Sequence, residues 1–216
     1  MKFESHGRKY QIDEIGVVTQ IDAKPYVYDN KYVSTYDTEA YKRQSDILQA
    51  LRFGFVVASH GSMPQSLLDW GYGNGAFMKF ANQKVMWVYG HDVTGIEVEG
   101  CKIVNELMVK GLGYDVVTFW DALEHIEDLS FLETLNSKTV VISLPYCHIM
   151  TQGKEWFDTK YKHRKPDEHL RHFNQTSLEL LMKRYGWRLV ASSNHEDIVR
   201  VSTHGLQNIL TMSFKR

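Results

Sequence analysis

The amino-acid sequence predicts an α/β fold in which a doubly wound sheet carries a small N-terminal appendage. A strand, a glycine-rich turn, a helix and a second strand follow one another between residues 66 and 89, which is the opening of such a sheet. Further apolar runs typical of buried strands occupy residues 114–119 and 139–144. At 216 residues the chain has room for one α/β domain with an appendage, and two full catalytic domains would not fit.

The segment that precedes the sheet is predicted to form the appendage. Residues 1–24 alternate loosely between apolar and polar side chains around His6-Gly7, which indicates a small hairpin. A tyrosine-rich segment, 25–37, follows it and contains Tyr26, Tyr28, Tyr32 and Tyr36. We therefore expect an N-terminal hairpin and tyrosine-rich segment over 1–37 and the main domain over 38–216.

Local patterns predict the first elements of the main domain. Apolar residues at helical spacing predict a helix over 38–58. Strands are expected over 66–69 and 86–89, and the helix between them over 76–83.

The later part of the main domain is less regular in pattern. Between Asp92 and Tyr114 we expect a short strand at 101–104, because Gly100 interrupts the alternative helix over 95–111. The remaining predictions are a helix over 176–185 and a final pair of strands over 187–191 and 198–202.

Composition excludes several classes of protein. The formal net charge of −1 and a pI near 6.8 provide no global field toward nucleic acid or an anionic membrane. Cys101 and Cys147 are too few for a disulfide framework and lack the paired spacing of a zinc site. No stretch of about 18 apolar residues and no apolar signal-peptide run occurs. We expect a cytoplasmic protein without a membrane segment, and the sequence does not indicate an oligomeric state.

The central motif is Leu68-Asp69-Trp70-Gly71-Tyr72-Gly73-Asn74-Gly75, an acidic residue at a strand end followed by glycines at every second position. Glycine allows a tight turn and a close approach of backbone to ligand. The following helix presents free N–H groups at the same place. The motif resembles the first motif of class I S-adenosylmethionine-dependent methyltransferases, enzymes with a Rossmann-like fold, and in particular the methyltransferase-23-like and small-molecule enzymes.

Three later stretches extend this resemblance. Val88-Tyr89-Gly90-His91-Asp92 ends the next strand, and Asp92 lies 23 residues beyond Asp69. The run from Gly113 to Ile126 is similar to the fourth-strand motif, in which an apolar strand leads into an acidic residue and a Leu-Glu-His turn. The stretch from His169 to Leu178, followed by Tyr185-Gly186-Trp187, resembles the C-terminal part of the family, so that the likeness covers roughly residues 66–190.

The resemblance implies S-adenosylmethionine as cofactor and S-adenosylhomocysteine as product. It implies that Asp69 lies near the methionine amino group, that Asp92 accepts the ribose hydroxyls, and that 119–121 flank the methionine end. The cofactor-binding residues that it implies are Asp69, Gly71, Tyr72, Gly73, Asn74, Gly75, Asp92, Val93, Asn105, Phe119, Trp120 and Asp121. On the adenine side the chain departs from the family pattern and offers only Asn105 and Glu106.

Histidine suits proton abstraction from an acceptor, since its pKa lies near working pH. The candidate catalytic residues are His125, His169 and His172, and the alternative is that they are satisfied polar residues of the pocket wall. Asp121, Glu124 and His125 could instead contribute to a metal site, but a metal needs three or more converging ligands. We expect no metal.

Rival interpretations remain for the glycine turn. Read with Ala76 it fits the Gly-x-Gly-x-x-Ala fingerprint of dinucleotide enzymes, although Asp69 would then meet a pyrophosphate of like charge. Tyr161 and Lys165 have the spacing of short-chain dehydrogenases, but Pro166 follows directly. Ser143-Leu144-Pro145-Tyr146 is superficially similar to the tetrapeptide of DNA amino-methyltransferases, but it closes the predicted fifth strand and not the fourth.

The sequence is therefore consistent with three functions. The first is a methyltransferase for a small-molecule acceptor, and the second a methyltransferase for nucleic acid or protein. The third is a binding module without turnover. The basic run over 160–165 could bind a phosphorylated or nucleic-acid acceptor, or it could be a solvated loop. The tyrosines of 25–37, with Trp156 and Phe157, could cover an acceptor or pack over the sheet.

Overall fold

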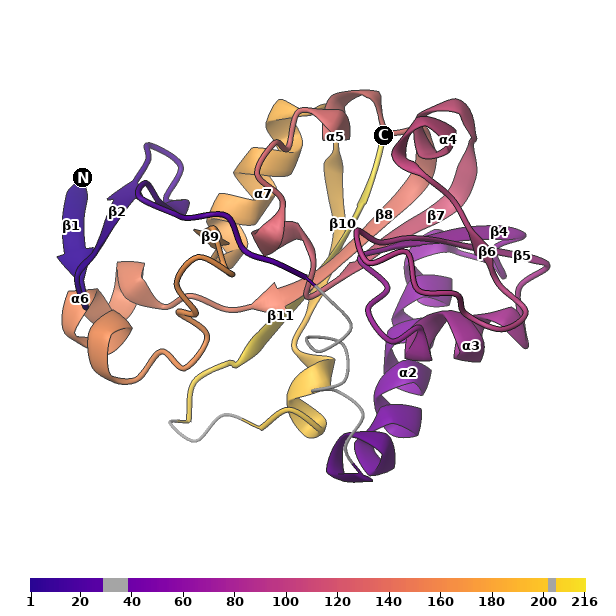
Figure 1. Ribbon diagram of the computed structural model, residues 1–216, viewed down its shortest axis with the longest axis horizontal. Helices are drawn as coiled ribbons and strands as arrows, with labels where there is room; N and C mark the ends of the chain where they lie inside the picture. Colours follow the sequence, from indigo (N-terminus) through magenta and orange to yellow (C-terminus); the bar gives the residue numbers. More distant parts are fainter. Residues whose placement is uncertain (29–38, 202–204) are drawn as a thin grey trace.

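Seven strands form the central sheet in the order β10-β11-β8-β7-β4-β5-β6 (Figure 1). The computed structural model describes residues 1–28, 39–201 and 205–216. The strands from β6 to β8 pair in parallel, whereas β11 runs antiparallel between β8 and β10. The strands of this sheet are β4 (Ser66–Trp70), β5 (Trp87–His91), β6 (Lys102–Ile103), β7 (Tyr114–Trp120), β8 (Ser137–Pro145), β10 (Arg188–Ser193) and β11 (Ile209–Lys215). The predicted doubly wound α/β fold is confirmed.

Helices cover both faces of this sheet because its strands are apolar on both sides. Leu67 and Leu68 are adjacent and fully buried, yet they belong to different cores. On one face the core includes α2 (Glu39–His60) and α3 (Ala76–Asn82). On the other it includes residues of α4 (Glu106–Gly111), α5 (Phe131–Thr134) and α7 (Gln175–Arg184). Two-sided burial is what makes near-continuous apolar strands characteristic of parallel sheets.

The N-terminal strands belong to a second, smaller antiparallel sheet, which lies to one side of the central sheet in Figure 1. Its strands are β1 (Lys2–Ser5), β2 (Arg8–Ile12), β3 (Val18–Gln20) and β9 (Arg171–His172). The hairpin expected around His6-Gly7 is present, and β9 completes the sheet from the distant part of the chain. Helix α6 (Ile149–Thr159) packs on it through Phe157, which contacts Tyr10 at a centroid distance of 5.2 Å.

The structure corrects two sequence-based expectations. The strand expected over 198–202 is wrong, because the antiparallel strand is β11 and His195–Ile198 form a short 3-10 turn, η2. Ile198 and Val201 are 72% and 66% exposed, whereas the side chains of 209–214 are fully buried. Helix α6 was not foreseen, because Gly153, at φ +77°, interrupts its helical pattern.

Between Asp92 and Tyr114 both alternatives hold in part. The expected short strand is β6, and helix α4 follows it. Asn105 caps this helix, because its side chain accepts a hydrogen bond from the Met108 N–H. Of the tyrosine-rich segment, Tyr26 and Tyr28 are described, whereas Tyr32 and Tyr36 lie outside the described residues. None of the helices in the described part of the chain has the length and apolar character that crossing a bilayer requires.

Asp167 joins the small sheet to the loop that precedes β9. Its carboxylate accepts hydrogen bonds from Arg8, from the Gln20 amide at 3.0 Å and from the Lys24 backbone N–H at 3.0 Å. Its own N–H donates to Gln20 Oε1 at 2.9 Å. The residue is held at φ +68°, a conformation that aspartate tolerates better than most residues. One side chain therefore fixes the N-terminal strands and the 165–170 loop against each other.

We expect the substitution Asp167→Ala to lower the free energy of unfolding by about 1–3 kcal/mol, because it leaves several donors without their charged acceptor. Hydrogen exchange should rise in 18–24 and 165–172 before it rises in the central sheet. The matched control is Glu14→Ala, which removes an exposed ion pair with Arg184 and should leave the free energy of unfolding nearly unchanged, because water screens such a pair. Equal effects of the two substitutions in urea denaturation would show that Asp167 does not couple these segments.

Candidate cofactor and acceptor site

A cavity of about 980 Å³ opens at the carboxyl ends of β4, β5 and β7. Its wall begins at the glycine turn after β4 and extends to the 3-10 turn η1 (Leu123–His125) and the loop before β9. Helix α2 contributes Leu48, Gln49 and Arg52 to the same wall. Ligands of doubly wound sheets bind at this edge, because loops diverge there from a topological switch point.

The glycine turn follows β4 closely and cannot hold side chains at two positions. Gly71 has φ +75°, and a Cβ built on it would lie 2.6 Å from the Ala122 Cβ. Gly75 has φ +73°, and its Cβ would lie 2.5 Å from Val98. The Gly71 N–H donates to the His91 carbonyl at 2.7 Å, which ties the turn to the end of β5. The glycines thus keep the turn narrow and its backbone accessible from the cavity.

Asp69 lies at the base of this turn and lines the cavity. It is 1% exposed, and the Thr118 hydroxyl donates to its Oδ1 at 2.7 Å. Burial raises the pKa of Asp69 to about 7, although the hydrogen bond from Thr118 acts to lower it. A cationic ligand group at this carboxyl would favour its ionised form.

Asp92 lines the cavity at the end of β5, and its carboxylate accepts hydrogen bonds from the glycine turn and from Thr94. Oδ2 accepts from the Gly73 N–H at 2.9 Å, and Oδ1 accepts from the Thr94 N–H at 2.9 Å and the Thr94 hydroxyl at 2.7 Å. A carboxylate offers about four acceptor positions. While Thr94 keeps its hydroxyl bond, about one position is left for a ligand hydroxyl.

The other residues implied for the cofactor divide between the cavity and its surroundings. Those that line the cavity are Tyr72, Gly73, Asn74, Val93, Trp120 and Asp121, together with Gly71, Asp69 and Asp92. Phe119 is fully buried in the core, and Gly75 lies behind the turn against Val98, so neither is part of the lining. Asn105 caps α4 and is also outside the lining, whereas Glu106, the second adenine-side candidate, belongs to it.

A network of charges, of which Arg52 and Glu196 are buried, includes Asp121 at the cavity wall. Arg52 donates to both oxygens of Glu196 at 3.0 Å and to Asp121 at 3.1 Å. Arg200 donates twice to Asp121, at 2.8 and 2.9 Å, and once to Glu196 at 2.9 Å. Burial opposes ionisation of both carboxyls, but the two arginines hold the pKa values of Asp121 and Glu196 below their ordinary range. The network is therefore electrically balanced, with two cations and two anions.

Sequence reasoning missed Arg52, Glu196 and Arg200. One signal was present: Arg52 stands between Leu51 and Phe53, among the apolar residues of a predicted helix. A cation at such a position needs a buried partner. Glu196 and Arg200 lie about 145 residues away in a turn without regular pattern, so the sequence alone does not pair them with Arg52.

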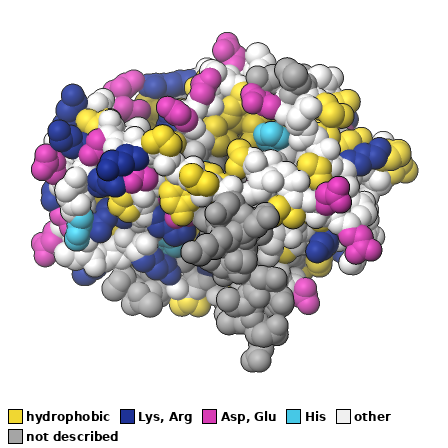
Figure 2. Space-filling model, viewed as in Figure 1, with side chains coloured by type: hydrophobic (Ala, Val, Ile, Leu, Met, Phe, Trp, Pro, Cys, Tyr) yellow, Lys and Arg dark blue, Asp and Glu magenta, His cyan; other side chains and the backbone are white. Residues whose placement is uncertain are grey.

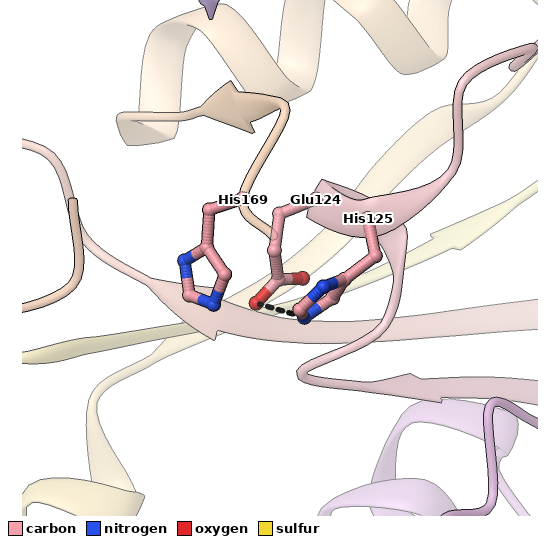
Figure 3. A group of neighbouring side chains, drawn as sticks. All are labelled: Glu124, His125 and His169. Atoms are coloured by element: carbon pink, nitrogen blue, oxygen red, sulfur yellow. Dashed lines mark ion pairs between the residues drawn. The ribbon is translucent and has the colours of Figure 1, made fainter. Parts of the chain in front are cut away.

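At the other end of the cavity, Glu124, His125 and His169 point toward one another (Figure 3). Their closest ligand atoms all lie within 4.8 Å of one another, and His125 Nε2 is 3.9 Å from Glu124 Oε1. Turn η1 carries the first two residues, and the loop before β9 carries His169. The Leu170 N–H donates to the Glu124 carbonyl at 2.9 Å, which fixes the loop against η1.

Burial determines the protonation of this group. It lowers the pKa of His125, and it lowers the pKa of His169 well below its ordinary value, with the neighbouring His125 adding to the effect. Burial, followed by the charge of Asp121, raises the pKa of Glu124 well above its ordinary value. The geometry brings together two of the three expected histidines. His172 instead packs among Tyr10, Phe157 and Tyr161 and is not part of the cavity lining.

Several rival features are not arranged as the alternative functions require, although Pro145, His163 and Lys165 line the cavity. Tyr161 is 6% exposed in the small core and is not part of the lining, so the Tyr161–Lys165 pair is not arranged as in a dehydrogenase. Within the basic run, Arg164 donates to Ser5 and to backbone carbonyls, and Lys165 pairs with Glu168 at 2.9 Å. Ser143 lies on β8, beyond β7 in the sheet, and donates to Glu196 at 2.7 Å.

Comparison with known proteins agrees with the resemblance to methyltransferases. The sequence model of the methyltransferase-23 family, described as a methyltransferase domain, matches residues 36–192. No curated protein sequence matches the chain. Among solved structures, 1,6-didemethyltoxoflavin-N1-methyltransferase from Burkholderia thailandensis is similar in fold with a TM-score of 0.55, 16% identity, and coverage of 99% of this chain and 97% of that one.

Two further structures are similar in fold. Magnesium protoporphyrin IX methyltransferase from Synechocystis aligns with a TM-score of 0.54 and 15% identity over 89% of this chain and 90% of that one. An S-adenosylmethionine-dependent methyltransferase from Clostridium acetobutylicum aligns with a TM-score of 0.54 and 13% identity over 86% of this chain and 98% of that one. At these identities the likeness shows the fold.

We expect Arg52→Met to lower the free energy of unfolding by about 3 kcal/mol, because it removes one of the two cations that compensate the buried Glu196. Adding Glu196→Gln to this variant should recover part of the loss. Lys79→Met, an exposed change on α3, is the control and should cost less than about 0.5 kcal/mol. A loss below about 1 kcal/mol for Arg52→Met in urea denaturation would contradict the role of the network in stability.

Proposed function

Because the chain belongs to the methyltransferase-23 family of class I S-adenosylmethionine-dependent methyltransferases, we propose that it methylates a small-molecule acceptor bound beside His125 and His169. The cofactor is S-adenosylmethionine. When bound, it supplies a methyl group on a sulfonium, whose thioether is a good leaving group. The single observation that carries the acceptor proposal is the continuous cavity that joins the glycine turn to the two histidines.

The residues of the cavity fit this cofactor. A Cβ at Gly71 would collide with Ala122, so this position holds glycine. The turn therefore presents backbone without a side chain, and a ligand can approach it closely. Asp69 offers a buried carboxyl to an ammonium group, and Asp92 offers its remaining acceptor position to a hydroxyl. Trp120 lines the same wall and carries the Arg52 guanidinium over its ring at 4.8 Å. We infer that these residues hold and orient the cofactor.

The protein's main task in such a transfer is to align the acceptor and exclude water. The acceptor end of the cavity is enclosed by η1, the 165–170 loop and Tyr28, whose hydroxyl shares a hydrogen bond of 2.9 Å with His125 Nδ1. The imidazole rings of His125 and His169 line this end, and their nitrogens can hydrogen-bond an acceptor. They therefore favour an acceptor that carries a polar O–H or N–H group.

Size and charge favour a small acceptor over a polymer. Small-ligand pockets span roughly 300–1,000 Å³, and a cavity of about 980 Å³ has room for a cofactor and a second small molecule. Of the exposed charged residues in the lining, Glu106, Glu127, Asp128 and Glu133 are acidic and Lys165 is basic. On the face drawn in Figure 2, basic and acidic described side chains are interspersed and form no continuous basic surface. A polyanion would gain little from such a surface.

The raised pKa of Asp69 leads to a pH-dependent affinity. We expect S-adenosylhomocysteine to bind more tightly as pH rises from 6 to 7.5, by up to about eightfold, because the ammonium of the ligand favours the ionised carboxyl and pH 6 leaves it mostly protonated. Calorimetry measures the dissociation constant at each pH. In Asp69→Asn, which keeps an acceptor for Thr118, binding should be weaker and its pH dependence flat; an unchanged slope would remove Asp69 from the cofactor site.

The acceptor class can be tested by the formation of S-adenosylhomocysteine, measured by mass spectrometry. We expect product with pooled small molecules that carry hydroxyl or amine groups, and none above the blank with RNA, DNA or protein. Gly71→Ala should abolish product, because its Cβ would collide with Ala122, whereas Gly54→Ala in α2 meets no atom within 4 Å and should remain active. Product formed only with RNA or DNA, and lost at high salt, would overturn the small-molecule proposal in favour of a nucleic-acid enzyme.

A further inference from the structure

The Glu124–His125–His169 cluster contains a buried carboxyl that no described group satisfies. Glu124 is 1% exposed, and neither of its side-chain oxygens has a hydrogen-bond partner among the described residues. The same holds for His169 Nδ1. A buried polar group without a partner costs about 1–3 kcal/mol, and a charged one costs more. Two such oxygens on one buried carboxyl are costly unless they share a partner that the described residues do not provide.

We propose that Glu124, His125 and His169 bind one divalent transition-metal ion, with open coordination positions toward the acceptor end of the cavity. This replaces the sequence-based expectation of no metal, which considered Asp121 together with Glu124 and His125. Asp121 is committed to Arg52 and Arg200, and the third ligand is His169 from a loop 44 residues further along the chain. The inference deepens the proposed function, because it assigns a ligand role to the two histidines that face the acceptor.

The arrangement of the three side chains suits such an ion. Metal bonds to imidazole and carboxylate are about 2.1 Å long, so that two ligands of one ion lie at most about 4.2 Å apart. The widest separation here is within 4.8 Å, and it closes by small rotations of the side chains. The backbone beneath is already fixed, since the Leu170 N–H donates to the Glu124 carbonyl at 2.9 Å.

The neighbours of the cluster support a ligand role for His125. Its Nδ1 is engaged by the Tyr28 hydroxyl at 2.9 Å, which directs Nε2 toward Glu124, 3.9 Å away. Histidine ligands of metals are commonly oriented in this way by a hydrogen bond at the second ring nitrogen.

The ligand set also indicates the class of ion. Two imidazole nitrogens and one carboxylate suit Zn²⁺, Fe²⁺, Mn²⁺ or Co²⁺, whereas Mg²⁺ and Ca²⁺ prefer oxygen ligands throughout. His125 and His169 line the cavity, so an ion held by them is accessible to an acceptor oxygen or nitrogen. A metal-bound hydroxyl loses its proton more readily than a free one. The histidines would then act on the acceptor through the ion and not as bases.

The test is direct measurement of metal binding on the full chain after treatment with EDTA and dialysis. We expect one equivalent of Zn²⁺ or Mn²⁺ by elemental analysis, and a visible absorption band when Co²⁺ is added. Glu124→Gln and His169→Gln should each weaken metal affinity by more than about 100-fold. His6→Asn, which removes an exposed histidine of the hairpin, should bind metal like the wild type.

Binding of S-adenosylhomocysteine separates this inference from the proposed function. Both cluster variants should keep the calorimetric affinity of the wild type, which also shows that they are folded, because the cofactor end of the cavity is intact. A wild-type protein that takes up none of Zn²⁺, Mn²⁺ and Co²⁺, or variants that bind these ions as tightly as the wild type, would overturn the metal site and leave the methyltransferase proposal standing. Failure to bind S-adenosylhomocysteine would instead count against the cofactor site.

Discussion

The pairing of four charged side chains, of which Arg52 and Glu196 are buried, is the constraint on which the architecture of the site depends. Arg52, Asp121, Glu196 and Arg200 come from α2, from the end of β7 and from the region of η2, and each would be costly alone in the interior. Together they satisfy one another, and Ser143 of β8 joins them. The helix that covers one face, the ends of two central strands and a late turn must therefore assemble as one unit.

The same principle explains the contrast between the two ends of the cavity. Around Asp121 every buried charge has an opposite partner within hydrogen-bond distance, so this region provides a rigid wall. Around Glu124 the polar atoms are gathered but not paired within the described residues. Because a carboxyl is among the costliest groups to bury without a partner, the two Glu124 oxygens call for an explanation such as a bound ion.

The cofactor end could be predicted from sequence because its determinants are local. Asp69, the glycine turn and Asp92 each follow a strand with a clear apolar pattern, and parallel pairing then brings the strand ends together. The acceptor end depends on contacts between distant segments, such as Leu170 with Glu124 and Tyr28 with His125, which no local pattern encodes. For the same reason, the strand expected over 198–202 is wrong and Ile209–Lys215 forms the strand instead. Pairing with β8, and not local propensity, determines which segment becomes the strand.

The place of β11 in the sheet has a consequence for how the chain is made. It is synthesised after every other strand, yet it lies between β8 and β10. Until residue 215 has left the ribosome, β8 has an unpaired edge along the apolar residues 140–142, which is a ready template for pairing with another chain. The nascent protein therefore passes through an aggregation-prone stage, in which the glycine turn can already form but the sheet that supports it is open on one side.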